Sequence, residues 1–336
     1  MHDSRHISTP TRQIHQVLTL LLLTALGGSA AVSCTKDVPG HSSTSPVIDF
    51  TSTTVTKTLV QDISDIHEFN IWGCAYGNTS TPSTAVFDQV RVTSGGTDNS
   101  WTYNGIRYWK AGMTYDFFGL YPTAAGASLN LETREFTITG YNALSISDPD
   151  GTQSDLLLAS ATGLTYDPAT QPDGPGAVQL TFTHLLVKIS IAVRTEGLGE
   201  GTVSLTDLQL LGPEPVGTYT SDGGWSEIPD QGNDIIKEYS PVQPDGTDLT
   251  DKGETFIDDL LLIPTEHPSA YQVRISYTEN GTSPGKDITV AIPSIPFWKP
   301  GESYLYTLTI KGDYIGFDRP LADDWDDADG GIIIVD

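Results

Sequence analysis

Hydrophobic and polar residues alternate along many short stretches of the chain, which is the pattern of β-strands that bury one face. The long run 178–193 contains two such alternations, so each of its halves can turn one face inward. Gly, Pro and Asn separate the stretches, and this punctuation favours β-sandwiches over helices. Further strands are predicted at 47–50 (continuing towards Thr56), 69–76, 85–92, 101–103, 106–109, 114–121, 135–139, 156–159, 203–211, 256–263, 271–277, 288–292 and 304–310.

A tight hairpin is predicted around Asn104-Gly105, which separates the strand candidates 101–103 and 106–109. Both residues tolerate the positive φ angles of a type I′ turn, and Asn-Gly is the strongest short-range hairpin signal. We therefore expect these two strands to pair with each other.

One decapeptide occurs twice in similar form. Tyr-Trp-Lys-Ala-Gly-Met-Thr-Tyr-Asp-Phe occupies 108–117, and Phe-Trp-Lys-Pro-Gly-Glu-Ser-Tyr-Leu-Tyr occupies 297–306. Each copy predicts an aromatic segment, a Gly turn and a strand with alternating aromatics. With 336 residues, the chain has room for about two domains. We predict a duplication, with an N-terminal β-sandwich domain over 46–177 and a C-terminal one over 178–336.

The N-terminus has the organisation of an export signal, predicted over 1–33. Arg5 and Arg12 precede a short apolar run, 17–26, and small residues then lead to Cys34. The run is shorter than a membrane-spanning helix requires, so no such helix is expected in the mature chain. A Ser-, Thr- and Pro-rich tether follows over 34–45. The segment Ala-Val-Ser-Cys34 resembles a lipobox, which makes Cys34 the expected site of lipid attachment (diacylglyceryl and palmitate). Ordinary cleavage, which would leave Cys34 free to pair with Cys74, is the alternative.

The charge balance argues against a nucleic-acid partner. The formal net charge is −26, and the 17 Lys and Arg residues are scattered among 43 Asp and Glu residues, whereas phosphate binding needs clustered bases. No HExxH, CxxC or GxSxG motif is present, and we predict neither an enzyme nor a cofactor. His184 is expected to be a hydrogen-bonded strand histidine. The acidic stretch around Trp325 departs from the calcium-loop pattern, so no metal site is predicted.

The C-terminus ends in a short apolar run, Ile332, Ile333, Ile334 and Val335, after an acidic stretch and a Gly330-Gly331 hinge. Such a strand is prone to aggregation unless it is paired. Two pairings are open: within its own sheet, or with another molecule by strand addition.

Taken in order, several segments resemble the fimbrillin family, the subunits of type V pili from Bacteroidales. The resemblance spans nearly the whole mature chain, and its segments are Cys34, 101–109, 115–122, 155–159, 180–189, 298–304 and Trp325 before an apolar strand. It implies two transthyretin-like Greek-key β-sandwich domains and an outer-membrane lipoprotein precursor at the cell surface. It further implies partnership with other fimbrial subunits, with the outer membrane through the lipid, and with a host or bacterial surface receptor.

The resemblance also implies a mode of assembly in which a protease removes the first strand and a neighbouring subunit fills the groove. Here Val47, Ile48 and Phe50 would belong to the displaced strand and Ile332 to Val335 would be the donor. Family members cut by an Arg-specific protease need an exposed Arg after the first strand. This chain has none between Cys34 and Arg91, and Lys57 is the basic residue placed for a cut. Stalk, tip and anchor roles stay open, and a monomeric surface lipoprotein that binds glycan or host protein is the alternative function.

Overall fold

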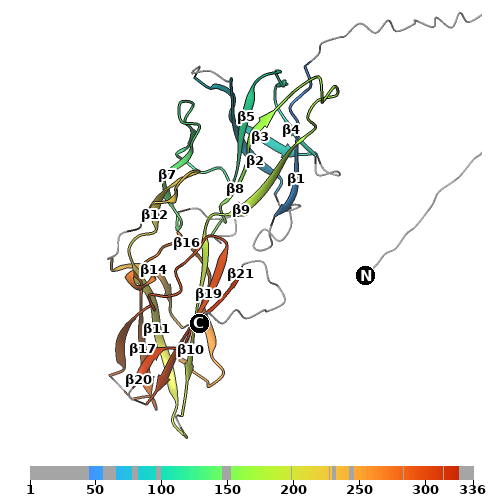
Figure 1. The fold of residues 1–336 in the computed structure, drawn as a ribbon. Helices are drawn as coiled ribbons and strands as arrows, with labels where there is room; N and C mark the ends of the chain where they lie inside the picture. Colours follow the sequence, from blue (N-terminus) through green and yellow to red (C-terminus); the bar gives the residue numbers. More distant parts are fainter. Residues whose placement is uncertain are drawn as a thin grey trace, which may run out of the picture. The chain divides into compact units, whose positions relative to one another are not determined.

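A computed structural model describes residues 45–55, 66–77, 82–95, 100–145, 153–197, 199–226, 228, 232–241, 246–282, 284–312 and 314–324. The regular structure in these segments is almost entirely β-strand (Figure 1), with one short 3-10 helix at Pro268–Ala270. Among the described residues, no helix has the length and apolarity needed to span a bilayer. The all-β class predicted from the alternating pattern is confirmed.

Seven strands form a closed barrel in the order β1-β4-β3-β2-β5-β8-β9. All neighbours in it are antiparallel except β1 and β9, which run parallel and close the ring. β9 alternates strictly between buried and exposed positions, as its sequence pattern predicts. The bounds of these strands are β1 Phe50–Val55, β2 Glu68–Tyr76, β3 Thr84–Ser94, β4 Ser100–Tyr103, β5 Thr114–Tyr121, β8 Leu157–Thr165 and β9 Val178–His184.

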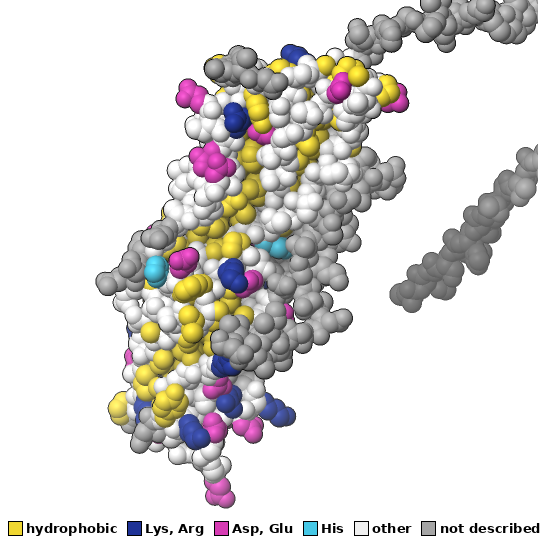
Figure 2. Space-filling model, in the orientation of Figure 1, with side chains coloured by type: hydrophobic (Ala, Val, Ile, Leu, Met, Phe, Trp, Pro, Cys, Tyr) yellow, Lys and Arg dark blue, Asp and Glu magenta, His cyan; other side chains and the backbone are white. Residues whose placement is uncertain are grey.

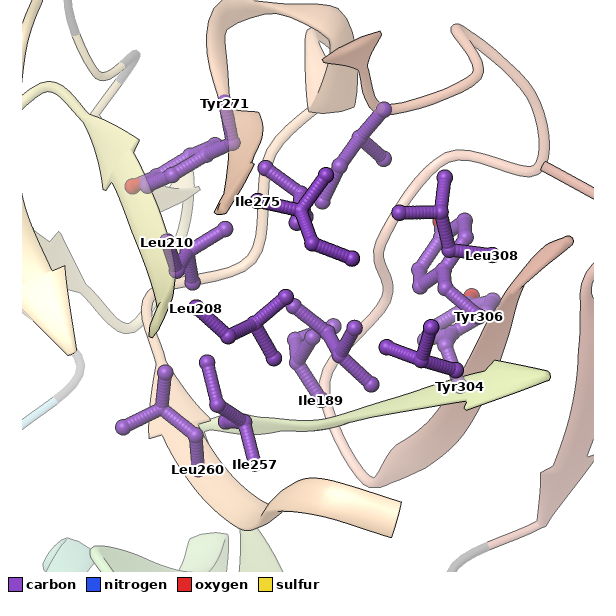
Figure 3. Close-up of a cluster of buried hydrophobic side chains, with 14 of the residues drawn as sticks. Ile189, Leu208, Leu210, Ile257, Leu260, Tyr271, Ile275, Tyr304, Tyr306 and Leu308 are labelled. Carbon is purple, nitrogen blue, oxygen red and sulfur yellow. The ribbon is translucent and has the colours of Figure 1, made fainter. Parts of the chain in front are cut away.

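Two further sheets enclose a second core. One has the order β16-β10-β19-β20 with β21 also paired to β19, and the other has the order β14-β11-β17-β18 with β15 also paired to β11. Figure 3 shows side chains from both sheets meeting in this core, among them Ile189, Leu208, Ile275 and Tyr306. The bounds are β10 Val187–Thr195, β11 Val203–Gly212, β14 Asp234–Tyr239, β15 Thr247–Asp248, β16 Glu254–Leu262, β17 Gln272–Glu279, β18 Lys286–Ala291, β19 Glu302–Lys311, β20 Tyr314–Phe317 and β21 Leu321–Asp324.

A four-stranded sheet, β13-β12-β7-β6, takes strands from both halves of the chain. β6 (Ala127–Leu129) and β7 (Phe136–Asn142) precede the barrel strand β8, whereas β12 (Val216–Thr220) and β13 (Gly224–Trp225) come after β11. The side chain of Gln153 adds a link, because its amide donates to the carbonyl of Leu261 at 2.9 Å and accepts from the Leu261 N–H at 3.0 Å. A third hydrophobic cluster lies here and includes Trp72, Phe136, Leu186 and Leu261.

The run 178–193 forms two strands, with the chain leaving the barrel between β9 and β10 at Leu185 and Leu186. β10 is buried on both faces, whereas its sequence predicts only one buried face. The second face carries Lys188 and Ser190, which are satisfied by carboxylates: Lys188 Nζ lies 3.4 Å from Asp259, and the Ser190 hydroxyl lies 3.1 Å from Asp258. Polar residues with partners can occupy a covered face without an unmet desolvation cost.

The predicted hairpin at Asn104-Gly105 is wrong. Gly105 has a positive φ of 77°, but Asn104 is not among the residues with positive φ, and β4 pairs with β3 and β1. Residues 107–109 pair instead with the segment that leads into β1, through hydrogen bonds from the Ile48 N–H to the Arg107 carbonyl and from the Trp109 N–H to the Pro46 carbonyl, each 2.9 Å. A distant partner strand therefore overrides the local turn signal.

Candidate functional site

The first strand of the barrel is the central feature of the candidate site. β1 lies between β4 and β9, with Phe50 opposite Trp101 on β4 and opposite Val178 on β9. The segment before it pairs with 107–109, where Val47 faces Tyr108 in an antiparallel bridge. Ladder bonds on both sides hold this strand, so its removal would leave two unpaired barrel edges.

Two inward side chains anchor this segment in the core. Ile48 is fully buried and Phe50 is 2% exposed, whereas Val47 is 39% exposed and Asp49 also faces solvent. The Phe50 ring packs edge-on against Phe87 and Phe117, with ring centroids 5.4 and 5.7 Å apart. Burying each such side chain stabilises the fold by about 1.5–3 kcal/mol. The structure thus places Val47, Ile48 and Phe50 together at the barrel closure.

Main-chain groups of the segment just before β1 are bonded to both flanks. The Tyr103 hydroxyl donates to the Ile48 carbonyl at 2.5 Å, and the Val178 N–H donates to the Asp49 carbonyl at 2.7 Å. Burial raises the pKa of the Tyr103 hydroxyl, and Asp49 contributes in the same direction. A phenol is protonated at neutral pH in any case, and this one can donate the bond.

A cleft of about 290 Å³ opens beside residues 106–110, the stretch that pairs with the segment before β1. Its lining is mainly apolar and includes Ile106, Tyr108 and Met113, with the two basic residues Arg107 and Lys110. Ile106 is 63% exposed and Tyr108 is 48% exposed. The Arg107 guanidinium donates to the carbonyls of Val86 at 3.0 Å and Gly105 at 3.1 Å, so main-chain oxygens hold it at the rim.

The two copies of the repeated decapeptide have the same local geometry. Trp109 and Trp298 are both buried, and Gly112 and Gly301 have φ angles of 77° and 72°. In each copy the Lys N–H donates to the Tyr hydroxyl five residues later, at 2.7 Å for Tyr115 and at 3.3 Å for Tyr304. The sheet context differs, because β5 has two antiparallel neighbours and β19 runs parallel to β10.

Other residues named from the sequence are structural. Cys74 is a buried free thiol whose pKa is raised by burial. His184 Nδ1 lies 2.5 Å from Asp155 Oδ2, which confirms a hydrogen-bonded strand histidine. Trp72 and Trp101 are core residues, whereas Trp225 is partly buried and its indole N–H donates to the Leu185 carbonyl at 2.7 Å.

Several predicted site residues fall outside the described part of the chain. They are the lipidation site Cys34, the processing candidate Lys57 and the donor candidates Ile332, Ile333, Ile334 and Val335. Within the described residues, no group of three or more His, Cys, Asp or Glu side chains could hold a metal ion. The cleft with Arg107 and Lys110 was missed by sequence reasoning, because its lining converges from three separate strand regions.

Charged side chains on the visible face are interspersed rather than segregated. Figure 2 shows Lys and Arg side chains lying among Asp and Glu side chains, with hydrophobic patches between them. Ion pairs such as Lys311 with Glu196, at 2.7 Å, are exposed, and pairs of this kind contribute little to stability.

The comparisons with known proteins agree with this architecture. The fimbrillin-like family model matches residues 53–325, and the chain belongs to that family. It is therefore a fimbrial or cell adhesion protein rather than an enzyme, as the absence of catalytic motifs predicted. Among curated proteins, none matches this chain.

Solved structures are similar to this chain at low sequence identity, and one with a TM-score above 0.5 shows the same fold. A candidate cell adhesion protein from Bacteroides eggerthii is 10% identical with a TM-score of 0.52, and the match covers 84% of this chain and 96% of that one. The tip fimbrial protein Mfa3 from Porphyromonas gingivalis is 11% identical with a TM-score of 0.40, covering 83% and 98%. The fimbrial anchor protein Mfa2 from the same organism is 12% identical with a TM-score of 0.37, covering 84% and 98%.

Proposed function

We propose that this protein is a structural subunit of surface fimbriae, of the type V kind, that assembles by β-strand exchange and mediates cell adhesion. One observation carries the proposal: β1 closes the barrel as its first strand, and Phe50 on this strand and Ile48 just before it insert into the core. Its loss would open a groove lined by apolar side chains and by unpaired main-chain groups of β4 and β9. A strand from another molecule satisfies such a groove, with backbone bonds providing affinity and alternate side chains filling pockets.

The donor in this proposal is Ile332 to Val335. Residues of this segment that are two apart, such as Ile332 and Ile334, match the spacing of Ile48 and Phe50. A head-to-tail contact between one subunit's C-terminus and the next subunit's barrel does not close on itself, so it builds a filament. Partners are therefore further fimbrial subunits, of this chain or of related ones.

We further propose that the protein reaches the cell surface as an outer-membrane lipoprotein carrying lipid on Cys34, with a signal peptide over 1–33 and a tether over 34–45. Cleavage near Lys57 would then release the anchored segment together with β1. We also propose that the chain forms two tandem transthyretin-like sandwich domains, over 46–177 and 178–336. β9 begins the second range at Val178 but pairs with the barrel strands β1 and β8, so this strand links the two ranges.

Unboiled, non-reducing electrophoresis of surface-extracted protein tests strand exchange. Mass analysis would define the mature N-terminus, and a variant lacking Ile332 to Val335 would run alongside. We expect a ladder of multimers that disappears in the variant, with a mature N-terminus beyond Phe50. A single monomer band with lipid on Cys34 in both samples would overturn polymerisation and favour an anchor subunit or a monomeric surface lipoprotein that binds glycan or host protein.

A further inference from the structure

The cleft beside residues 106–110 combines exposed apolar surface with positive charge in a strongly acidic protein. Ile106 and Tyr108 are exposed at its rim, and Arg107 and Lys110 lie next to them. Among the described residues the Lys110 side chain forms no ion pair. A partner that suits this surface carries negative charge next to an aromatic or aliphatic side chain.

The chain itself contains a segment with that chemistry. Asp326, Asp327 and Asp329 follow Trp325, between β21 and the apolar run that begins at Ile332. The overall charge of −26 makes two subunits repel each other. An acidic segment that approaches a second copy is therefore favoured where that copy presents bases.

The register of β1 relates this segment to the cleft. Val47 faces Tyr108 in an antiparallel bridge, and the Trp109 N–H donates to the Pro46 carbonyl at 2.9 Å. A strand that continued this register two residues further would bring its residue in the place of position 45 opposite Lys110. If a donor strand runs in the direction of β1 with Ile332 in the place of Ile48, Asp329 takes the place of Ser45. Ser45 and Val47 both face solvent, as Lys110 does. Opposite charges in such cross-strand positions attract each other.

We infer that the cleft lined by Arg107, Tyr108 and Lys110 is the docking site for the acidic C-terminal segment 325–329 of a second copy of this chain. The inference rests on the proposed strand exchange and adds an electrostatic contact that sets donor direction and register. In this arrangement Asp329 pairs with Lys110 of the second copy. Removal of β1 also removes Asp49, an acid on the same segment, and so leaves the cleft more positive.

Zero-length carbodiimide cross-linking tests the contact directly in polymers formed from equal amounts of ¹⁴N- and ¹⁵N-labelled full-length protein. We expect cross-linked peptides that join Lys110 to Asp326, Asp327 or Asp329, with mixed isotope labels that identify two different subunits. Cross-links of these acids to other lysines only, or Lys110 links within one subunit only, would overturn the inference.

Charge reversal gives a second, functional test. Lys110→Glu should slow ladder formation by roughly tenfold at low ionic strength, and Lys110→Glu combined with Asp329→Lys should recover most of the rate. The matched control is Lys252→Glu, an exposed lysine on the turn before β16, which should stay within about twofold of wild type. The slower ladder formation of Lys110→Glu should largely disappear near 1 M salt, where the Debye length is about 3 Å.

The outcomes separate the two proposals. If Lys110→Glu forms the multimer ladder as fast as Lys252→Glu does, the docking site is rejected. Strand exchange would still stand in that case. Absence of any ladder from the wild-type protein would reject strand exchange itself.

Discussion

Nδ1 of His184 lies 2.5 Å from Oδ2 of Asp155, and both side chains are almost fully buried, at 2% and 1% exposure. The other carboxylate oxygen accepts the Leu156 N–H at 2.7 Å. This pair joins the end of β9 to the segment that enters β8, close to where the chain leaves the barrel. It is a buried contact between two segments of the fold.

Asp155→Ala should lower the free energy of unfolding by about 2–5 kcal/mol, because it takes the carboxylate away from two buried donors or acceptors. Asp155→Asn, which keeps the shape and one acceptor oxygen, should cost clearly less. Urea unfolding monitored by Trp fluorescence measures both. An alanine variant as stable as wild type would show that this pair contributes nothing.

Phe50→Ala should destabilise the protein by about 3–5 kcal/mol, because the ring is buried among Phe87, Tyr103 and Phe117. Asp49→Ala, one residue earlier on the solvent side, should change stability by less than about 0.5 kcal/mol. Thermal unfolding of the two variants checks the contrast. Equal effects at the two positions would contradict the inward anchoring of this strand.

Two glycines with positive φ should differ strongly when each is replaced by alanine. Gly112 has φ 77° and open space around an added Cβ. Gly112→Ala should therefore lower the free energy of unfolding only through backbone strain at positive φ, by about 1–2 kcal/mol. Gly126 has φ 80°, and an added Cβ would meet the Thr139 carbonyl oxygen of β7 in a severe overlap. Gly126→Ala should therefore cost more than Gly112→Ala in urea unfolding, and the reverse order would contradict the turn geometry.

Stability should fall at alkaline pH because of buried tyrosines. Burial raises the pKa of Tyr306 to about 12, although the hydrogen bond from Trp298 lowers it slightly, and burial also raises the pKa of Tyr141 and Tyr271. In the unfolded chain these phenols ionise near pH 10. Above that pH the unfolded state binds fewer protons than the folded state. The contribution of these tyrosines to the free energy of unfolding is therefore fully present below pH 10 and is lost as pH rises.

The Tyr306 contribution should amount to roughly 2–3 kcal/mol by pH 12. Guanidinium unfolding between pH 9 and pH 12, with phenolate absorbance at 295 nm, measures the slope. Tyr306→Phe should flatten that slope even if it lowers stability at neutral pH. An unchanged slope in this variant would exclude Tyr306 as its source.

The sequence predicted strands where alternation is strong and local. β5 occupies 114–121, as expected, and β2, β11 and β19 differ from their predicted ranges only at the ends. Short strands such as β12, β13 and β20 were not predicted, because few of their positions are both apolar and periodic. The hairpin at Asn104-Gly105 failed because pairing with a segment about 60 residues earlier in the chain is a tertiary property.

The candidate site was predicted only in part. The resemblance implied a first strand with Val47, Ile48 and Phe50, and the structure shows that Ile48 and Phe50 are buried. No local pattern indicates that β1 runs parallel to β9, since the two strands are far apart in sequence. The repeated decapeptide was visible because its buried Trp, turn Gly and hydroxyl-bearing Tyr act within ten residues. The different sheet surroundings of the two copies depend on the rest of the chain.

The sheet that combines β7 with β12 has a consequence for biosynthesis. When the ribosome has released β7, its partner at Val216–Thr220 has not yet been made, and β1 must likewise wait for β9. Long-range pairings of this kind are slow to form. The nascent chain therefore cannot complete its fold until most of it has emerged from the ribosome.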